Sequence, residues 1–102
     1  MKIELLQPAL SNLSAEAYDK NTPICWITNE MLPIYTTIKV EEQKSPKHTY
    51  YVFLIEKRIK AESGKSETVE QKRTTHYHKA IGIAVNLQNK YDNSIKTTLW
   101  NS

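Results

Sequence analysis

The sequence predicts an α+β domain in which an antiparallel sheet of five to six strands packs against one N-terminal helix. Two observations lead to this class: β-rich or alternating segments recur from residue 24 onward, and an earlier segment has apolar residues at helical spacing. The chain of 102 residues is about the size of one domain, so residues 1–102 are expected to share a single core. That length excludes the larger dinucleotide-binding and α/β-barrel enzymes.

The N-terminal segment begins with a short strand, expected at Lys2–Leu6, and continues into the predicted helix. Its apolar residues are spaced four, three and four positions apart, which places them on one stripe of a helix. Pro8 suits the first helical turn, where a missing N–H is tolerated. The spacing predicts a helix over Pro8–Lys20. The stripe consists of Leu6, Leu10, Leu13 and Ala17.

Three central segments have the patterns of strands. Ile24–Ile27 is apolar on both faces, which suits a strand covered on both sides. Ile34–Glu41 alternates between apolar and polar residues, so one face is expected in the core and the other in water. Tyr50–Ile59 follows a polar loop at Gln43–His48; it is apolar on both faces in its first half and alternates in its second.

A turn at Ser63–Lys65 leads from this strand into Glu67–Lys79, a β-rich but polar segment, and the two are expected to form a hairpin. A three-residue loop with Gly64 in a left-handed conformation is favoured, because it pairs opposite charges at about 0.2–1 kcal/mol per pair. That register pairs Ile59 with Val69, Arg58 with Glu70 and Glu56 with Lys72. A two-residue loop would instead pair Ile55 with Lys72 and Ile59 with Thr68.

The C-terminal part is expected to add two strands. Ala80–Leu87 alternates between large apolar and small residues, which predicts a strand with a bulge at Gly82. A helix is the alternative for this segment, because short apolar runs fit both patterns. Ile95–Trp100 is expected to form a last short strand. From these strand phases, the predicted core includes Trp26, Ile38, Phe53, Ile55 and Val85.

Composition and charge exclude several classes of function. A net charge of +3 and a pI near 9.0 permit a nucleic-acid partner without requiring one. Cys25 is the only cysteine, so an intramolecular disulfide is excluded and a reducing compartment is expected. The first residues lack the apolar run of a signal peptide, and no apolar stretch is long enough for a bilayer, so a cytoplasmic protein without a membrane partner is expected. Two glycines cannot build a glycine-rich phosphate loop, and no cofactor is expected.

Few residues are arranged to carry catalysis. His76 and His78 lie two positions apart on a predicted strand, so they would share one face and could reach the same metal ion. A metal-dependent hydrolase centred on them is a third hypothesis, but a zinc site needs further ligands, and exposed histidines without a metal are favoured. Cys25 with His48 or His76 is the one conceivable thiol nucleophile, yet a cysteine among large apolar residues is expected to be inert in the core. No acidic residue is isolated within an apolar run, where a carboxyl pKa would be raised.

The most specific surface feature is the basic hairpin, residues 57–79. Its cations lie near aromatic residues, a combination that suits stacking on bases and neutralisation of phosphates. In the predicted register, Tyr51 lies opposite Tyr77 and Arg73 lies on the same face. Glutamates in the same hairpin are equally typical of a solvated surface strand. The candidate binding residues are Tyr51, Arg58, Lys72, Arg73, His76, Tyr77, His78 and Lys79.

The sequence therefore predicts a small binding protein rather than an enzyme, acting on another protein as an adaptor, inhibitor or immunity-type factor. The alternative is a nucleic-acid-binding module that uses the basic hairpin. Twelve lysines against two arginines, with many Asn, Ile and Tyr residues, indicate AT-rich codons, and a phage or mobile element is a hypothesis for the source. The sequence predicts neither the partner's identity nor the oligomeric state. Candidates for either core or interface are Trp26, Met31, Leu32 and Trp100.

Overall fold

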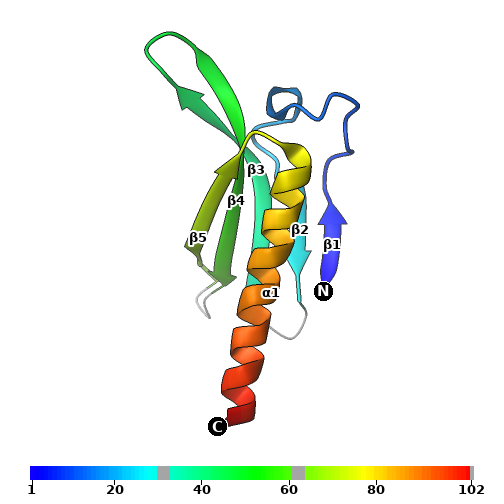
Figure 1. The fold of residues 1–102 in the computed structure, drawn as a ribbon, viewed down its shortest axis with the longest axis vertical. Helices are drawn as coiled ribbons and strands as arrows, with labels where there is room; N and C mark the ends of the chain where they lie inside the picture. The colour runs from blue at the N-terminus through cyan, green and yellow to red at the C-terminus, as the bar shows by residue number, and fades with distance from the viewer. Residues whose placement is uncertain (30–32, 61–63, 102) are drawn as a thin grey trace.

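Five antiparallel strands form one sheet in the order β1-β2-β3-β4-β5, and one long helix lies across it (Figure 1). The computed structural model describes residues 1–29, 33–60 and 64–101, with side chains described up to residue 90. The elements are β1 (Lys2–Leu5), the 3-10 helix η1 (Ala15–Ala17), β2 (Cys25–Thr28), β3 (Ile34–Lys44), β4 (Thr49–Lys60), β5 (Ser66–Thr74) and α1 (Tyr77–Asn101). The α+β class and the antiparallel sheet are confirmed, but the helix is C-terminal rather than N-terminal.

The predicted helix over Pro8–Lys20 is wrong. The chain between β1 and β2 is a loop in which only η1 is helical, and Leu13 has a φ of 49°, which interrupts a helix. Side-chain hydrogen bonds hold the loop: the Gln7 amide donates to the Thr22 carbonyl at 2.8 Å, and the Asp19 amide donates to Gln7 Oε1 at 3.0 Å. Leu10 and Leu13 still pack against the core, so their spacing reports burial and not a helix.

The segments 80–87 and 95–100, predicted as strands, belong to α1. Ala80, Ala84 and Leu87 are buried against the sheet at spacings of four and three residues, while Gly82 is exposed. The period-two pattern arose because apolar residues on the flanks of this stripe are partly buried as well. The helix that the sequence allowed as the alternative is therefore the correct structure for this segment.

The core lies between the sheet and α1. Ile38, Phe53 and Ile55 are buried there as predicted, and Val85 is partly buried on the helix. Trp26 is 41 % exposed, so its predicted burial is wrong. Met31, Leu32 and the side chain of Trp100, the other candidates for core or interface, lie outside the described residues.

β4 and β5 form the predicted hairpin, but in another register. Ile55 pairs with Lys72, as the two-residue loop would have it, and a β-bulge after Lys57 then shifts the pairing by one residue. Gly64 has the predicted left-handed conformation, with a φ of 84°. β5 ends at Thr74, so the predicted pairing of Tyr51 with Tyr77 is wrong.

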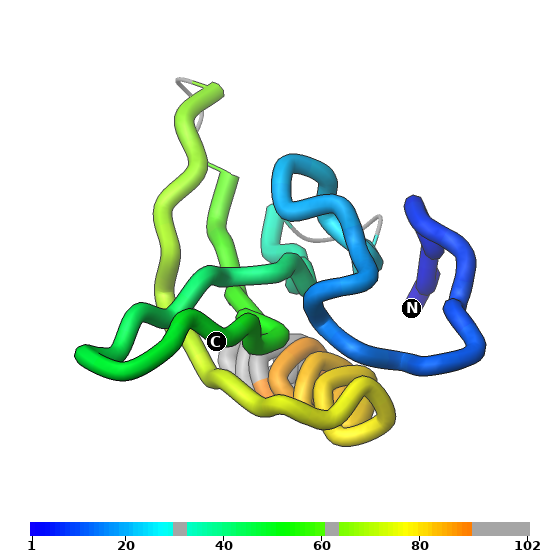
Figure 2. Tube along the Cα trace, turned by 90° about the horizontal axis from the view of Figure 1, so that it is seen from above, coloured from blue at the N-terminus to red at the C-terminus, as the bar shows by residue number. Residues whose placement is uncertain are grey.

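The sheet has a covered face and an open face. α1 packs on the covered face, where the buried residues of the three central strands are Cys25, Ile27, Ile38, Val40, Phe53 and Ile55. Figure 2 shows α1 on one side of the sheet, and the described residues contain no second α-helix. The open face is therefore the face on which α1 does not pack.

No helix in the described part of the chain is both long enough and apolar enough to cross a membrane.

Candidate functional site on the open face of the sheet

The open face carries the side chains that alternate with the buried residues of the covered face. Cys25 and Ile27 point toward α1, so Trp26 between them points the other way. Paired residues in an antiparallel sheet share a face, which places Tyr35 and Arg58 together, as well as Thr37 and Glu56. Ile24–Ile27 was interpreted as covered on both sides, and the exposed Trp26 shows that only one side is covered.

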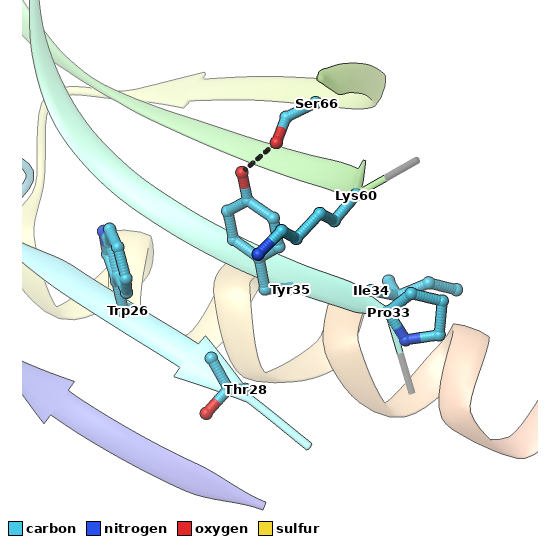
Figure 3. Close-up of a pocket in the computed structure, with 7 residues that line it drawn as sticks. All are labelled: Trp26, Thr28, Pro33, Ile34, Tyr35, Lys60 and Ser66. Atoms are coloured by element: carbon cyan, nitrogen blue, oxygen red, sulfur yellow. Dashed lines mark hydrogen bonds between the residues drawn. The ribbon is translucent and has the colours of Figure 1, made fainter. Parts of the chain in front are cut away.

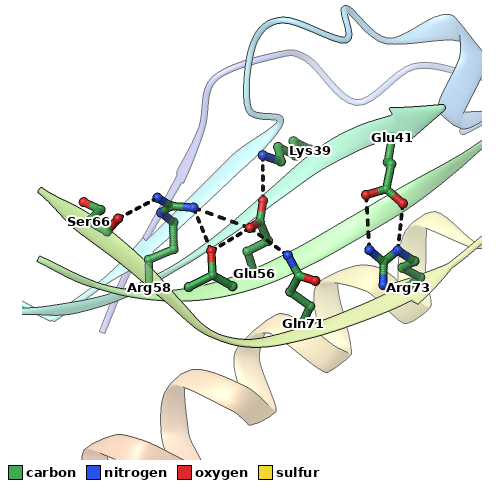
Figure 4. A network of polar contacts seen from close by, with 8 residues as sticks. Lys39, Glu41, Glu56, Arg58, Ser66, Gln71 and Arg73 are labelled. Carbon is green, nitrogen blue, oxygen red and sulfur yellow. Dashed lines mark hydrogen bonds and ion pairs between the residues drawn. The ribbon is translucent and has the colours of Figure 1, made fainter.

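Glu56 is a buried carboxylate near the centre of the open face (Figure 4). Its side chain is 4 % exposed, and Lys39 Nζ lies 2.7 Å from its Oε1 atom. The Thr68 hydroxyl and the Gln71 amide donate to its Oε2 atom at 2.9 and 3.2 Å. Arg58 Nη1 lies 3.4 Å from the same oxygen. Side chains from three strands therefore converge on one carboxylate.

The β-bulge makes this convergence geometrically feasible. Thr68 and Gln71 lie three positions apart on β5, so in a regular strand they would point to opposite faces. The register skips Val69, and both side chains reach Glu56 from the open face. The prediction from cross-strand charge pairs misses this bulge. Each such pair contributes about 1 kcal/mol or less, whereas leaving the buried carboxylate of Glu56 without hydrogen bonds would cost more.

Opposing effects set the pKa of Glu56. Burial raises this pKa, but hydrogen bonds from Lys39, Gln71 and Thr68 and the charge of Lys39 outweigh burial, so the pKa lies below its ordinary value. Glu56 is therefore ionised at neutral pH and organises its neighbours, and it is poorly suited to donate a proton. In the sequence, Glu56 directly follows the apolar run Tyr50–Ile55. Because it is not inside that run, the sequence pattern did not predict its burial.

A pocket of about 320 Å³ lies at one end of the open face (Figure 3). Trp26 and Tyr35 line it from neighbouring strands, with ring centroids 6.1 Å apart. The Tyr35 hydroxyl donates to Ser66 Oγ at 2.8 Å, which fixes the ring. Pro33 and Lys60 are further lining residues. Apolar walls with a few polar groups are typical of ligand-binding pockets of this size.

A second hollow shares Trp26 and Tyr35 with this pocket and continues toward Lys39, Glu56 and Arg58. The two hollows together therefore combine an exposed tryptophan, a fixed tyrosine and the polar network around Glu56. Their lining residues include three cations, Lys39, Arg58 and Lys60, against one carboxylate, Glu56. The surface is thus aromatic and positively charged.

The structure separates the residues of the basic hairpin. Lys57 is fully buried on the covered face, and its Nζ atom donates to the Leu87 carbonyl at 2.7 Å. Arg58 and Arg73 lie on the open face, where Arg73 Nε donates to Glu41 at 2.7 Å. Lys72 is exposed and pairs with Ile55, so its side chain belongs to the other side of the sheet. These four cations of the hairpin are thus divided between the two faces of the sheet.

The remaining predicted site residues lie at the start of α1 or beside it. His76 precedes the helix, and His78 and Lys79 are exposed in its first turn. Tyr77 is buried and stacks on Tyr18, with ring centroids 6.0 Å apart. Tyr51, half-buried, accepts a hydrogen bond from Lys20 Nζ at 3.2 Å. Of the predicted binding residues, only Arg58 lines the hollows around Trp26.

The premises of the metal and thiol hypotheses are not met. His76 and His78 do not share a strand face, and the described residues contain no group of three His, Cys, Asp or Glu side chains arranged to hold a metal ion. Cys25 is fully buried, and burial raises the pKa of its thiol. The thiolate, which is the nucleophilic form, is therefore disfavoured, and the buried position predicted for Cys25 is confirmed.

Comparisons of the chain with protein-family models, with curated proteins and with solved structures find no match. The functional interpretation therefore comes from the geometry of the open face.

Proposed function

We propose that this chain is a binding protein that docks a protein partner on its open face through Trp26. The observation that carries the proposal is the exposure of Trp26, on a sheet face without a covering helix, beside a pocket of about 320 Å³. Trp, Tyr and Arg are the residues most enriched at binding hot spots, and Trp26, Tyr35 and Arg58 lie together here. Adaptors, inhibitors and immunity-type factors act through contacts of this kind.

The polar network supports this role because it holds the groups around Trp26 in place before a partner arrives. Arg58 donates to Thr68 at 2.9 Å and to the Ser66 carbonyl at 3.1 Å, so its guanidinium has little freedom left to lose. Tyr35 is fixed by Ser66 in the same way. Ordering a side chain on binding costs about 0.5–1.5 kcal/mol, and a preorganised surface avoids part of that cost.

The lining charges indicate the chemistry of the partner. Three cations against one carboxylate favour an acidic segment, and the apolar walls favour one apolar or aromatic side chain as its anchor. We infer that the partner presents an apolar side chain flanked by Asp or Glu residues, with the anchor in the pocket beside Trp26.

A displayed library of random peptides, selected on the wild-type protein, tests this proposal. Enriched peptides are expected to contain an apolar residue next to acidic residues, and Trp26→Ala is expected to weaken their binding about tenfold or more. Tyr50→Ala is the matched control, because Tyr50, on β4, is also an exposed aromatic residue but lines neither hollow. Titrations in a Trp100→Phe background report directly on the fluorescence of Trp26.

Three outcomes would contradict the proposal: selected peptides that bind Trp26→Ala as tightly as wild type, peptides that are basic, or a library that yields no enrichment. A gel-shift titration with single-stranded DNA and RNA at two salt concentrations tests the alternative partner. Tight binding that weakens steeply with salt would identify phosphate contacts and favour a nucleic acid over a protein. We expect weak or no binding, because four cations of the basic hairpin are divided between the two faces of the sheet.

A further inference from the structure

The two edges of the sheet differ in how they are protected. β5, at one edge, has a bulge and mainly polar or charged residues, which are common means of preventing contact between sheets. β1, at the other edge, is regular and carries Ile3 and Leu5, which are 50 % and 54 % exposed. In Figure 1, β1 lies at the rim of the sheet with no element beyond it. β1 is therefore the edge suited to pair with another strand.

The pairing of β1 with β2 determines which main-chain groups point outward. The Leu6 amide donates to the Ile24 carbonyl at 2.9 Å, which continues the register in which Glu4 pairs with Trp26. Hydrogen-bonded and non-hydrogen-bonded pairs alternate along an antiparallel ladder. The N–H and C=O groups of Ile3 and Leu5 therefore point away from β2, toward the free edge.

We propose that β1 pairs antiparallel with β1 of a second copy of this chain, with Ile3 opposite Ile3 at a two-fold axis. In this register, Lys2 faces Glu4 of the second copy, and Leu5 faces Met1 of the second copy. The outward groups of the two Ile3 residues then form a hydrogen-bonded pair, as the ladder requires. Opposite charges face each other on one side of the sheet, and apolar residues face each other on the other.

The neighbouring registers are worse because they oppose like charges. A ladder centred on residue 2 places Lys2 opposite Lys2, and one centred on residue 4 places Glu4 opposite Glu4. Registers shifted by an odd number would oppose inward and outward main-chain groups, and they would need a bulge. Of the registers centred on residues 2, 3 and 4, the ladder centred on Ile3 satisfies the main chain, the charges and the apolar residues together.

The resulting dimer has a continuous ten-stranded sheet, since each copy contributes five strands. Its two-fold axis is perpendicular to the sheet, so both helices lie on one side and both open faces on the other. Ile3 and Leu5 of the two copies form an apolar strip between the helices. This inference does not depend on the proposed partner for the open face.

Sedimentation velocity of the full chain, without an added N-terminal tag, is the experiment that tests the dimer. We expect a reversible monomer–dimer equilibrium in the micromolar range of protein concentration. Lys2→Glu and Glu4→Lys, each alone, place like charges opposite each other twice and are expected to raise the dimer Kd about tenfold. The double variant Lys2→Glu/Glu4→Lys restores opposite charges and is expected to return the Kd to near the wild-type value.

Ile3→Pro provides a second test that acts on the main chain. It removes the N–H that would cross the dimer axis and leaves the hydrogen bonds to β2 in place, so the variant is expected to stay folded but monomeric. Its melting temperature and circular dichroism report on folding separately. A wild-type protein that is monomeric at about 100 µM, a dimer that persists in Ile3→Pro, or a double charge variant without rescue would overturn the proposal.

Discussion

The two faces of the sheet bury opposite charges at neighbouring positions of β4. On the covered face, Lys57 donates to a main-chain carbonyl of α1, and Gln88 beside it bridges the Thr36 hydroxyl and the Ile34 carbonyl at 2.8 and 3.1 Å. On the open face, Glu56 is surrounded by side chains of the sheet itself. The covered face thus relies on a second layer to satisfy its polar groups, whereas the open face satisfies Glu56 within one layer and leaves Trp26 accessible.

Together with the proposed function, this difference predicts that the covered face stabilises the fold and that the open face binds the partner. Apolar burial under α1 favours folding, because it removes Ile38, Phe53 and Ile55 from water. The network on the open face fixes polar groups around the buried carboxylate of Glu56 and leaves Trp26 exposed. Substitutions on the two faces should therefore separate folding from binding.

The largest effect is expected for Phe53→Ala on the covered face. Phe53 is fully buried and packs edge-on against Tyr18 and Tyr77, with ring centroids 5.9 and 5.8 Å away. Loss of the ring should lower the free energy of unfolding by about 3–5 kcal/mol. Urea denaturation followed by circular dichroism measures this change. A loss below about 1 kcal/mol would show that the packing between α1 and the sheet is not the main core of the domain.

An intermediate effect is expected for Glu56→Gln, which keeps the shape of the side chain and removes its charge. Loss of charged hydrogen bonds should lower the free energy of unfolding by about 1–3 kcal/mol at neutral pH. Arg73→Gln is the control, because its ion pair with Glu41 is exposed and should contribute about 0–1 kcal/mol. If the free energy of unfolding fell equally in the two variants, the burial of Glu56 would not strengthen the contribution of its hydrogen bonds to stability.

The pH dependence of the same variant sharpens the comparison. The pKa of Glu56 in the folded state lies below the ordinary value of 4.5, so its ionised form stabilises the fold above that value. This contribution is lost as the pH falls below 4.5 and through the folded pKa. The difference in free energy of unfolding between wild type and Glu56→Gln should therefore shrink in acid, and thermal melts at a series of pH values measure it. A difference that stays constant would assign the loss to shape and not to charge.

A smaller effect on folding than for Phe53→Ala and Glu56→Gln is expected for Trp26→Ala, the variant that should affect binding most. Trp26 is 41 % exposed and contacts the Tyr35 ring, so its loss should cost about 1 kcal/mol. The melting temperature measures this change next to that of Phe53→Ala. If Trp26→Ala unfolded the chain, the open face would be part of the core, and its role in recognition would have to be abandoned.

The first four strands lie where the β-rich or alternating patterns indicated, because these patterns follow burial. The hairpin of β4 with β5 was also predicted, but β5 ends at Thr74 and pairs in another register, and the two segments predicted as strands after it belong to α1. The predicted helix over Pro8–Lys20 and the predicted strand over Ala80–Leu87 were wrong for different reasons. Leu10 and Leu13 have helical spacing in a loop that packs on the core, and Ala80–Leu87 fits both periods because apolar residues flank its buried stripe.

The candidate site was largely missed because its features depend on what covers each face. The apolar run Ile24–Ile27 does not reveal that one side remains open, so Trp26 was assigned to the core. The charges of the basic hairpin do not reveal that Lys57 points inward and Arg58 outward, since a bulge and a buried acid decide the register. Arg58 was predicted as a binding residue because of its charge, but its pairing with Tyr35 was not predicted.

The adjacent buried charges of β4 have a consequence for how the chain avoids misfolded pairings. A slip of β4 by one residue exchanges the faces of all its side chains. Lys57 would then lie near Lys39 on the open face, while Glu56 would lie near the Leu87 carbonyl on the covered face. In a strand with only apolar side chains, such a shifted register could persist as a compact misfolded state. In β4, the charges of Glu56 and Lys57 make the shifted register unfavourable on both faces of the sheet. The adjacent charges of Glu56 and Lys57 would thereby favour the native register of β4 over the shifted register during folding.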